Sequence, residues 1–352
     1  MQAFITIIAS GLNTCGIYAL AALGIILIYR TSDTTNYAQG TISTFGAYIG
    51  AWVAKSITAP ISNYVTAYQA VAFPGTTREE LEQAIANAPN PVAKPGAISN
   101  LFARFGENGE YVGYNGWAVA IVSAIIAVIC AIIIGVLIDR IIISRARHSN
   151  PLTKQIITLG LISVFLGLST VVFGTDPYTF EAFVPGSISI AGANVSWSFI
   201  ANIIISAVII AIMFTALIKT RWGLSVRATS SNEMVARMMG IPTPIITMVS
   251  WAIAAAVGTL AALMYAPTTS VDTTLMNSIQ VISLLACVLG GFETFHGPII
   301  TACLIALFKS FLAYYGGDFV RSFIEAITYI VVLILVLIKP QGLFGKKIVK
   351  KV

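Results

Sequence analysis

Charged residues are scarce in this chain of 352 residues: Asp, Glu, Lys and Arg together make up 10%, whereas 57% of the residues are apolar. A soluble domain of average composition carries about 25% charged residues. The mean hydropathy of +0.88 agrees with this deficit. Because each helical crossing takes about 20 apolar residues, the composition predicts an all-α, polytopic membrane helix bundle of eight to ten spans and argues against a soluble enzyme.

Residues that carry metal or covalent chemistry are also few, with two histidines and four cysteines. Cys15, Cys130, Cys287 and Cys303 lie in apolar runs without a C-x-x-C pair, so we interpret all four as small core residues and expect no metal site. The chain lacks a Gly-x-x-x-x-Gly-Lys-Ser/Thr loop. ATP hydrolysis would therefore come from a partner chain, and we expect neither a cofactor nor a catalytic residue here.

Nine apolar segments are long enough to be interpreted as spans, and nine crossings place the two termini on opposite sides of the membrane. The segments are 3–29, 36–54, 117–139, 155–174, 197–219, 243–266, 278–291, 297–315 and 319–338. Most of the 20 Lys and Arg residues fall in the loops of one side and in the C-terminal tail. The positive-inside rule makes that side cytoplasmic, with an external N-terminus. This asymmetry accounts for the net charge of +6, so we expect the lipid bilayer, and not nucleic acid, as a partner.

One long polar stretch, 55–115, interrupts this single transmembrane domain of residues 1–352. It holds Pro60 and four further prolines, so it cannot span a bilayer, and we interpret it as an external insertion. Within it, the capping-box spacing of Thr77 and Glu80 predicts one short helix. A passive spacer and a contact surface for an extracytoplasmic partner both remain open.

Two segments are interrupted by glycine, one at 36–50 and the other at 289–298. Broken helices persist in hydrocarbon only against protein or a water-filled cavity, and such segments point to a transporter's pathway. We therefore expect Asn36 and Gln39 to offer amide donors and acceptors to a solute, and the glycines to allow close backbone approach. The expected pathway residues are Asn36, Gln39, Gly40, Gly46, Gly290, Gly291 and Gly297. Close helix packing through small residues is the alternative.

The segment 219–244 lies on the expected cytoplasmic side and contains helix signals. Ser230 with Glu233 three residues later predicts a helix start, and Gly240 with Pro242 predicts its end. The helix should cover 231–240 and present Met234 and Met238 on one face, a pattern that suits a groove on another protein. Packing against the chain's own spans or the lipid surface is the alternative. The residues expected to couple to a partner are Ser231, Glu233, Met234, Val235, Met238, Met239 and Gly240.

Lys309 and Glu325 are the two ionisable groups inside expected spans, where charge is costly. They stand eight residues before and after Gly317, at the expected hairpin turn, so they should lie at equal depth. We interpret them as an intramembrane ion pair. Outward snorkelling of Lys309 alone and a role in the pathway are the alternatives.

Several motifs, taken in order, resemble the branched-chain amino-acid permease family of ABC importers. They are Gly16-Ile17-Tyr18-Ala19-Leu20, Asn36-Tyr37-Ala38-Gln39-Gly40, Ala236-Arg237-Met238-Met239-Gly240, Leu289-Gly290-Gly291 and Lys339-Pro340-Gln341-Gly342-Leu343-Phe344-Gly345. The likeness covers nearly the whole chain except 55–115. The family commonly has histidine where this chain has Gln39, and often a further glycine at the position of Glu293.

The resemblance implies a transport subunit of the bacterial inner membrane that carries branched-chain amino acids or related small solutes by alternating access. The wider family also moves urea and short amides. The implied partners are a second permease subunit, two ATP-binding subunits that hydrolyse ATP, and an extracytoplasmic solute-binding protein. The segment 219–244 is similar to the family's cytoplasmic coupling loop. A nucleotide-independent channel and an intramembrane enzyme are the alternatives from other classes.

Overall fold

The computed structural model describes residues 2–71, 95–105, 111–147, 149–190 and 192–345, and it is helical along most of this length. The short helix expected after Thr77 lies outside the described residues. The principal helices are α1 (Gln2–Ser32), α2 (Gln39–Val71), α5 (Gly116–Ile138), α6 (Pro151–Phe173), α7 (Trp197–Lys219), α10 (Thr243–Tyr265), α11 (Asn277–Gly290), α12 (His296–Tyr315) and α14 (Ile324–Ile338). The sequence prediction of an all-α membrane helix bundle is confirmed.

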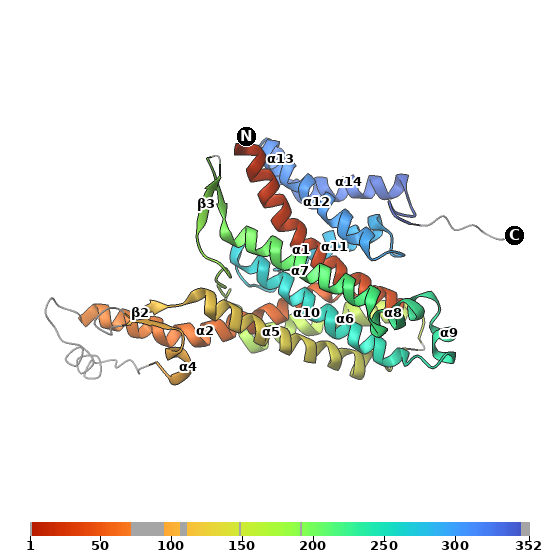
Figure 1. Cartoon of the computed structure of the whole chain (residues 1–352), viewed down its shortest axis with the longest axis horizontal. Helices are drawn as coiled ribbons and strands as arrows, with labels where there is room; N and C mark the ends of the chain where they lie inside the picture. The colour runs from red at the N-terminus through yellow and green to blue at the C-terminus, as the bar shows by residue number, and fades with distance from the viewer. Residues whose placement is uncertain (1, 72–94, 106–110, 148, 191, 346–352) are drawn as a thin grey trace.

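Shorter elements connect these helices at both ends of the bundle. The short helices are α4 (Ala97–Asn100), α8 (Arg221–Ser231), α9 (Glu233–Met238) and α13 (Asp318–Ser322), with a π-helical turn at Asp139–Ile143 and a 3₁₀ turn at Ala266–Thr268. Strands β1 (Ala103–Phe105) and β2 (Tyr111–Tyr114) pair antiparallel, as do β3 (Ser187–Ile190) and β4 (Ala193–Ser196). Figure 1 shows the start of α1, the strands, α4 and α13 toward one end, and α8 and α9 at the other.

Six of the described helices are long and apolar enough to cross a membrane, whereas nine spans are expected from the sequence. Two further apolar helices, α11 and α14, have 14 and 15 residues, and the latter is separated from α13 by Phe323. The remaining expected span that is not among these six helices is α2. It has 33 residues, which is long enough, but it carries polar side chains such as Thr41, Ser43 and Thr44. These side chains are buried within the protein, so α2 does not need an apolar surface toward lipid.

The core of the bundle is formed by α1, α2 and α10. Within the most apolar part of α1, 89% of the residues are buried, and the corresponding share is 67% for α10. The share falls to 22% in α6 and α7, whose exposed residues include Val171 and Ile212. Because α6 and α7 leave apolar side chains uncovered, they form the outer, lipid-facing layer.

Helix α2 corrects two expectations. Its glycines, including Gly40 and Gly46, lie in a continuous helix rather than in a broken one, and the helix continues through Pro60 to Val71. A proline inside a helix costs about 3 kcal/mol, which is why the sequence predicts an end near residue 54. Here Ile57, Ile61 and Tyr64 are buried, and α2 also packs against β2 and α4. This burial offsets the cost of the proline.

The interpretation of all four cysteines as unpaired core residues is wrong for two of them. Cys15 of α1 and Cys303 of α12 form a disulfide, with their Cα atoms 4.4 Å apart. Cys130 and Cys287 remain free thiols. The two bonded residues are separated by 288 positions, so only the close packing of α1 on α12 reveals the pair.

Candidate functional site

The side-chain amides of Asn36 and Gln39 form a buried centre at the start of α2, and both residues are at most 1% exposed. Asn36 Nδ2 donates to Gln39 Oε1 over 3.1 Å, and Gln39 Nε2 donates to the carbonyl of Ala254 in α10 over 2.7 Å. Gln280 of α11 donates to the backbone carbonyl of Asn36 over 3.3 Å. The two residues thus connect α2 to α10 and α11 through hydrogen bonds between neutral groups.

Gly40 and Gly46 let α2 approach its neighbours closely. A Cβ atom added to Gly40 would lie 2.9 Å from the Cβ of Gln280 in α11, and one added to Gly46 would overlap the side chain of Thr259 in α10. Such distances are shorter than packed side chains allow, so neither position has room for a larger residue. Along α2 the glycines therefore serve close helix packing in this conformation.

The second glycine segment separates two helices, since α11 ends at Gly290 and α12 begins at His296. The backbones of Gly290 and Gly297 are in contact, and a Cβ on Gly290 would overlap the backbone of Gly297. Gly291 has φ +82°, a left-handed conformation that favours glycine over other residues. We call residues 290–297 the glycine turn.

The segment 339–345 packs against the glycine turn. Leu343 N donates to the carbonyl of Leu289 over 2.7 Å, and the ring of Phe344 lies edge-on to His296 with 5.9 Å between ring centroids. A Cβ on Gly342 would lie 2.7 Å from the amide nitrogen of Gly291. The segment therefore covers the backbone of the turn, a contact that the sequence motif alone does not indicate.

The seven expected pathway residues form two separate groups in the structure. Four of them lie at the start of α2, and Gly290, Gly291 and Gly297 belong to the glycine turn. None of the seven lines the two polar pockets described below. Asn36 and Gln39 are buried and hydrogen-bonded to protein groups in this conformation. Their contact with a solute stays a prediction.

The segment 219–244 contains two helices, α8 and α9, and this differs from the single helix expected over 231–240. Ser231 ends α8, and the N-cap of α9 is Asn232 rather than Ser230. Asn232 Oδ1 accepts from the amide of Val235 over 3.0 Å. Asparagine caps a helix as well as serine does, and the extended backbone of Asn232 (φ −160°) separates the two helices.

Helix α9 is short, but its ends are fixed by several interactions. Arg237 and Glu233 form an ion pair of 2.7 Å one turn apart. At the other end, Gly240 has φ +82° and Ile241 N donates to the carbonyl of Ala236 over 3.1 Å. This is the Schellman pattern, which satisfies the last carbonyls of a helix.

The apolar side chains of α9 point away from the protein. Met234, Met238 and Met239 are 71–78% exposed and Val235 is 50% exposed, whereas Ala236 is buried. We call these four exposed side chains the methionine face. A soluble protein or loop rarely exposes such a contiguous apolar group, which indicates a contact with another molecule.

The structure brings Lys309 of α12 and Glu325 of α14 together. Lys309 Nζ lies 3.2 Å from Glu325 Oε1 and 3.3 Å from the hydroxyl of Tyr18 in α1. The side chain of Lys309 is 20% exposed and that of Glu325 is 48% exposed. The pair therefore lies at the surface of the bundle, where it connects α14 to the core through Tyr18.

We expect the double variant Lys309→Met, Glu325→Gln to be less destabilised than the sum of the two single variants. Each single change strands a charge next to lipid, whereas the double change removes both charges, so the coupling should be about 0.5–3 kcal/mol. The midpoint of thermal unfolding in detergent measures this coupling across the four proteins of the cycle. Additive effects would mean that the two groups are independent despite their contact.

A polar pocket of about 420 Å³ lies where α1, the α8–α9 junction and the glycine turn meet. Arg30, Asp33, Asn232, Glu233 and Glu293 are among its lining residues. The guanidinium of Arg30 also stands over the ring of Phe295, 5.5 Å from its centroid. The pocket therefore joins α9 to the end of α1 and to the glycine turn.

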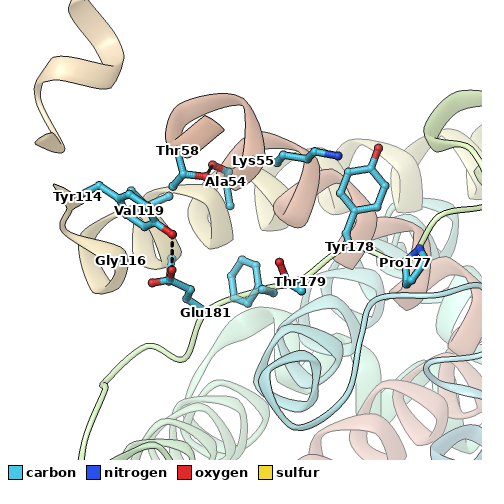
Figure 2. A pocket seen from close by; sticks show the side chains of 12 residues that line it. Ala54, Lys55, Thr58, Tyr114, Gly116, Val119, Pro177, Tyr178, Thr179 and Glu181 are labelled. Carbon is cyan, nitrogen blue, oxygen red and sulfur yellow. Dashed lines mark hydrogen bonds between the residues drawn. The ribbon is translucent and has the colours of Figure 1, made fainter. Parts of the chain in front are cut away.

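A second polar pocket, of about 180 Å³, lies near the opposite end of the bundle between α2, β2, the start of α5 and residues 177–181. Figure 2 shows Lys55 and Glu181 on opposite sides of it. Tyr114 donates its hydroxyl hydrogen to Glu181 Oε1 over 2.6 Å, and Lys55 Nζ lies 4.7 Å from the ring centroid of Tyr178. We call this space the Lys55–Glu181 pocket.

Four hydrogen bonds hold the walls of the Lys55–Glu181 pocket in place. Tyr178 is fixed by backbone hydrogen bonds to Val271 of 3.0 and 2.8 Å, and its hydroxyl donates to the carbonyl of Phe173. Burial and the hydrogen bond to Glu181 raise the pKa of Tyr114 to about 12. Its hydroxyl therefore keeps its proton near neutral pH and remains a donor to the carboxylate.

Sequence reasoning misses this pocket. The sequence marks Lys55 only as a residue of the expected external side, and Glu181 carries no motif. The one available signal is a single acidic residue within the aromatic stretch Tyr178–Phe183, between two expected spans. Its partner Tyr114 is 67 positions away, so the pairing requires the fold.

Comparison with known proteins identifies the family. A family model described as branched-chain amino acid transport system, permease component, matches residues 7–339. A protein of Methanocaldococcus jannaschii, described as a probable branched-chain amino acid transport permease protein LivH, is 22% identical over 331 residues, which cover 93% of this chain and 88% of that protein. No solved structure matches this chain. Because the family model covers nearly the whole length, the chain belongs to the branched-chain amino-acid permease family of ABC importers and is a membrane transport subunit rather than an enzyme.

Proposed function

We propose that this chain carries branched-chain amino acids, or closely related small solutes, across the bacterial inner membrane by ATP-driven alternating access. It would act with a second permease subunit, two ATP-binding subunits and an extracytoplasmic solute-binding protein. The name of the M. jannaschii relative and the family description support the solute class. The methionine face on α9 is the observation that carries the ATP-driven mechanism, since it offers an apolar contact at one end of the bundle.

The fixed ends of α9 support a role in transmitting force. The Asn232 cap, the Glu233–Arg237 ion pair and the Gly240 turn hold the helix as one unit, and an isolated helix of six residues would not persist in water. A partner that moves the methionine face would therefore move the whole of α9. We propose that 219–244 is the coupling loop of the transporter.

Contacts of α8 and of the α8–α9 junction would transmit a movement of α9 to the helices of the bundle. Val226 of α8 is fully buried and packs in one cluster with Leu23 and Leu27 of α1 and Ile246 of α10. The 420 Å³ pocket brings the α8–α9 junction next to Arg30 and Phe292. Displacement of α9 would thus act on α1, on α10 and on the glycine turn, and α10 receives the hydrogen bond from Gln39.

The four pathway residues at the start of α2 fit this mechanism, because they would become accessible when the helices separate. Gly40 and Gly46 allow α2 to pack closely against α11 and α10. Gln39 adds a hydrogen bond from α2 to the carbonyl of Ala254 in α10. When these helices move apart, the side-chain amides of Asn36 and Gln39 would lose protein partners and become available to a solute. A pathway that alternates between packed and open states is consistent with their burial in this conformation.

Orientation follows from the charge distribution, with residues 55–115 as an external insertion and the C-terminus in the cytoplasm. Single cysteines at Asp176 and at Lys339, both exposed, report the two sides in a background without the native cysteines. We expect an impermeant maleimide added to intact cells to label position 176 and to spare position 339. Labelling of 339 alone would reverse the topology.

Purification from native membranes in a mild detergent tests the proposed function. Two ATP-binding subunits and a second permease should be recovered with this chain, and leucine uptake by the assembled transporter should stop when vanadate blocks ATP hydrolysis. Recovery of the chain alone, with uptake that persists after ATP depletion, would favour a nucleotide-independent channel instead.

A further inference from the structure

Three helices end at the polar pocket of about 420 Å³, which we call the Asp33 pocket. Helix α1 ends at Ser32, α8 at Ser231 and α11 at Gly290, and residues within two positions of each end line the pocket. The C-terminal end of a helix carries a partial negative charge, because its last carbonyl groups have no partner within the helix. Helix α9 also begins here, but it has six residues and its first turn is capped by Asn232. The backbone therefore gives the pocket a negative potential.

The charged side chains leave one negative charge uncompensated. Three carboxylates line the pocket, those of Asp33, Glu233 and Glu293. Glu233 is paired with Arg237, and Glu293 lies near enough to Arg30 for the two charges to attract each other. Asp33 makes no ion pair and no side-chain hydrogen bond with the described residues. One further positive charge would therefore balance the pocket.

A buried hydroxyl group also indicates a ligand in this space. Thr229 of α8 lines the pocket and is 5% exposed. Its Oγ1 has no hydrogen-bond partner among the described residues, although a helical threonine can donate to the carbonyl of the preceding turn. An unsatisfied buried hydroxyl costs free energy, and a group with N–H donors that enters the pocket would remove this cost.

Aromatic rings form a further part of the wall. Tyr29 and Phe292 both line the pocket, and their ring centroids are 4.3 Å apart. The face of an aromatic ring attracts a cation, and the ring also covers an apolar side-chain stem. Aromatic groups beside an unpaired carboxylate therefore favour an organic cation as the occupant.

The dimensions of the pocket agree with a whole side chain rather than a metal ion. Among the described residues, no three carboxylate, histidine or cysteine side chains are placed to hold a metal. The volume lies within the range of roughly 300–1,000 Å³ that is typical of pockets for small organic groups. Asp33 and Glu293 are exposed, whereas Thr31 and Thr229 are buried, so the pocket is open on the side of the two carboxylates.

The Asp33 pocket adjoins the methionine face. Glu233 lines the pocket, and the next residue in sequence, Met234, belongs to the methionine face. Figure 1 shows α8 and α9 together at one end of the bundle. On the proposed orientation this end is cytoplasmic, where most Lys and Arg residues of the chain lie, so a negatively charged pocket is exceptional there. A partner that covers the methionine face would also reach the pocket.

We propose that the Asp33 pocket receives one lysine or arginine side chain of the ATP-binding subunit that covers the methionine face. The positive group would pair with Asp33, and its stem would lie against the aromatic wall. The inference rests on the proposed function and deepens it, because it adds a charged contact outside the coupling loop 219–244. This contact would join the ATP-binding subunit directly to α1, the most buried helix of the bundle.

Titration of the ATP-binding subunits onto the membrane subunits in lipid nanodiscs tests the contact. Asp33→Asn removes the charge and keeps the backbone, because asparagine tolerates a φ of +51° as aspartate does. We expect this variant to bind roughly tenfold more weakly, as for the loss of one charged hydrogen bond. Raising KCl from about 50 mM to about 300 mM should weaken binding to the unmodified chain and have a smaller effect on the variant.

Asp176→Asn is the matched control. It makes the same change in net charge at an exposed residue near the opposite end of the bundle, and it does not line the Asp33 pocket. Its affinity for the ATP-binding subunits and the salt dependence of that affinity should equal those of the unmodified chain. The unfolding midpoint of Asp33→Asn in detergent should not fall below that of the control, which separates weaker binding from misfolding.

A double-mutant cycle identifies the side chain that enters the pocket. Each Lys and Arg of the ATP-binding subunit is exchanged for glutamine and combined with Asp33→Asn. One exchange should weaken binding to the unmodified chain and have no further effect on binding to Asp33→Asn, because the two groups act as a pair.

Failure of the pocket and failure of the proposed function are distinguishable. The pocket inference is wrong if Asp33→Asn binds like Asp176→Asn, or if every exchange in the partner is additive with Asp33→Asn. A soluble cation is the occupant instead if spermidine raises the unfolding midpoint of the unmodified chain but not of Asp33→Asn, while the affinity for the ATP-binding subunits is unchanged. Absence of any binding of ATP-binding subunits to the unmodified membrane subunits rejects the proposed function itself.

Discussion

Replacing Met234 and Met238 with aspartate should abolish solute uptake and release the ATP-binding subunits, while the chain itself inserts and folds normally. Both side chains are more than 70% exposed, so the substitutions remove little packing within the chain. In the assembled transporter each aspartate would enter an apolar groove of the partner, at a cost of a few kcal/mol for an uncompensated polar group. Two such penalties lower the affinity by several powers of ten.

Recovery of ATP-binding subunits in a pull-down, together with leucine uptake, measures this effect. The double variant Met234→Leu, Met238→Leu is the matched control, because it keeps the face apolar and should retain both partners and uptake. The unfolding midpoint of the purified aspartate variant should equal that of the unmodified chain. Normal partner recovery and uptake in a well-expressed aspartate variant would leave α9 as an ordinary surface helix.

The variant Gly290→Ala should lower the stability of the bundle more than an alanine at any exposed helical glycine. The added methyl group would overlap the backbone of Gly297, so the glycine turn would have to open. Overpacking of this kind costs about 1–3 kcal/mol, and contact with backbone offers less relief than contact with a flexible side chain. The segment 339–345 should loosen as well, because Leu343 is hydrogen-bonded to the residue before Gly290.

Gly160→Ala provides the matched control within the same chain. Gly160 lies in α6, and no atom lies within 4 Å of the position that an added Cβ would take, so alanine there should be neutral or stabilise the helix by up to about 1 kcal/mol. Unfolding midpoints in detergent compare the two variants directly. Equal midpoints for Gly290→Ala and Gly160→Ala would show that the turn can expand without strain.

Features encoded by local composition could be predicted from the sequence. The apolar runs of α5, α6, α7, α10 and α12 indicate spans because a bilayer requires about 20 consecutive apolar residues. The contact of Lys309 with Glu325 is expected from their equal distances to a turn, since two charged groups at one depth in hydrocarbon favour each other. The methionine face follows from helical spacing.

Features that depend on distant partners could not be predicted in this way. The continuation of α2 through Pro60 depends on packing against β2 and α4, and the disulfide depends on contact between α1 and α12. The sequence prediction places the cap of α9 two residues too early because serine and asparagine both favour that position, and local sequence does not choose between them. Lys55 and Glu181 come to line one pocket only through the fold, so no spacing rule connects them.

The position of α2 at the centre of the bundle has a consequence for the order of events during synthesis. Its buried residue Gln39 is hydrogen-bonded to Ala254, which follows 215 positions later in the chain. At about 5–20 residues per second, a ribosome needs roughly 10–40 s to deliver that partner. During this interval α2, which is not among the six apolar helices, lacks the contacts that it makes with α10 in the complete fold. Slower translation of the region between α2 and α10 should therefore extend the life of an incompletely inserted chain and expose it to membrane proteases.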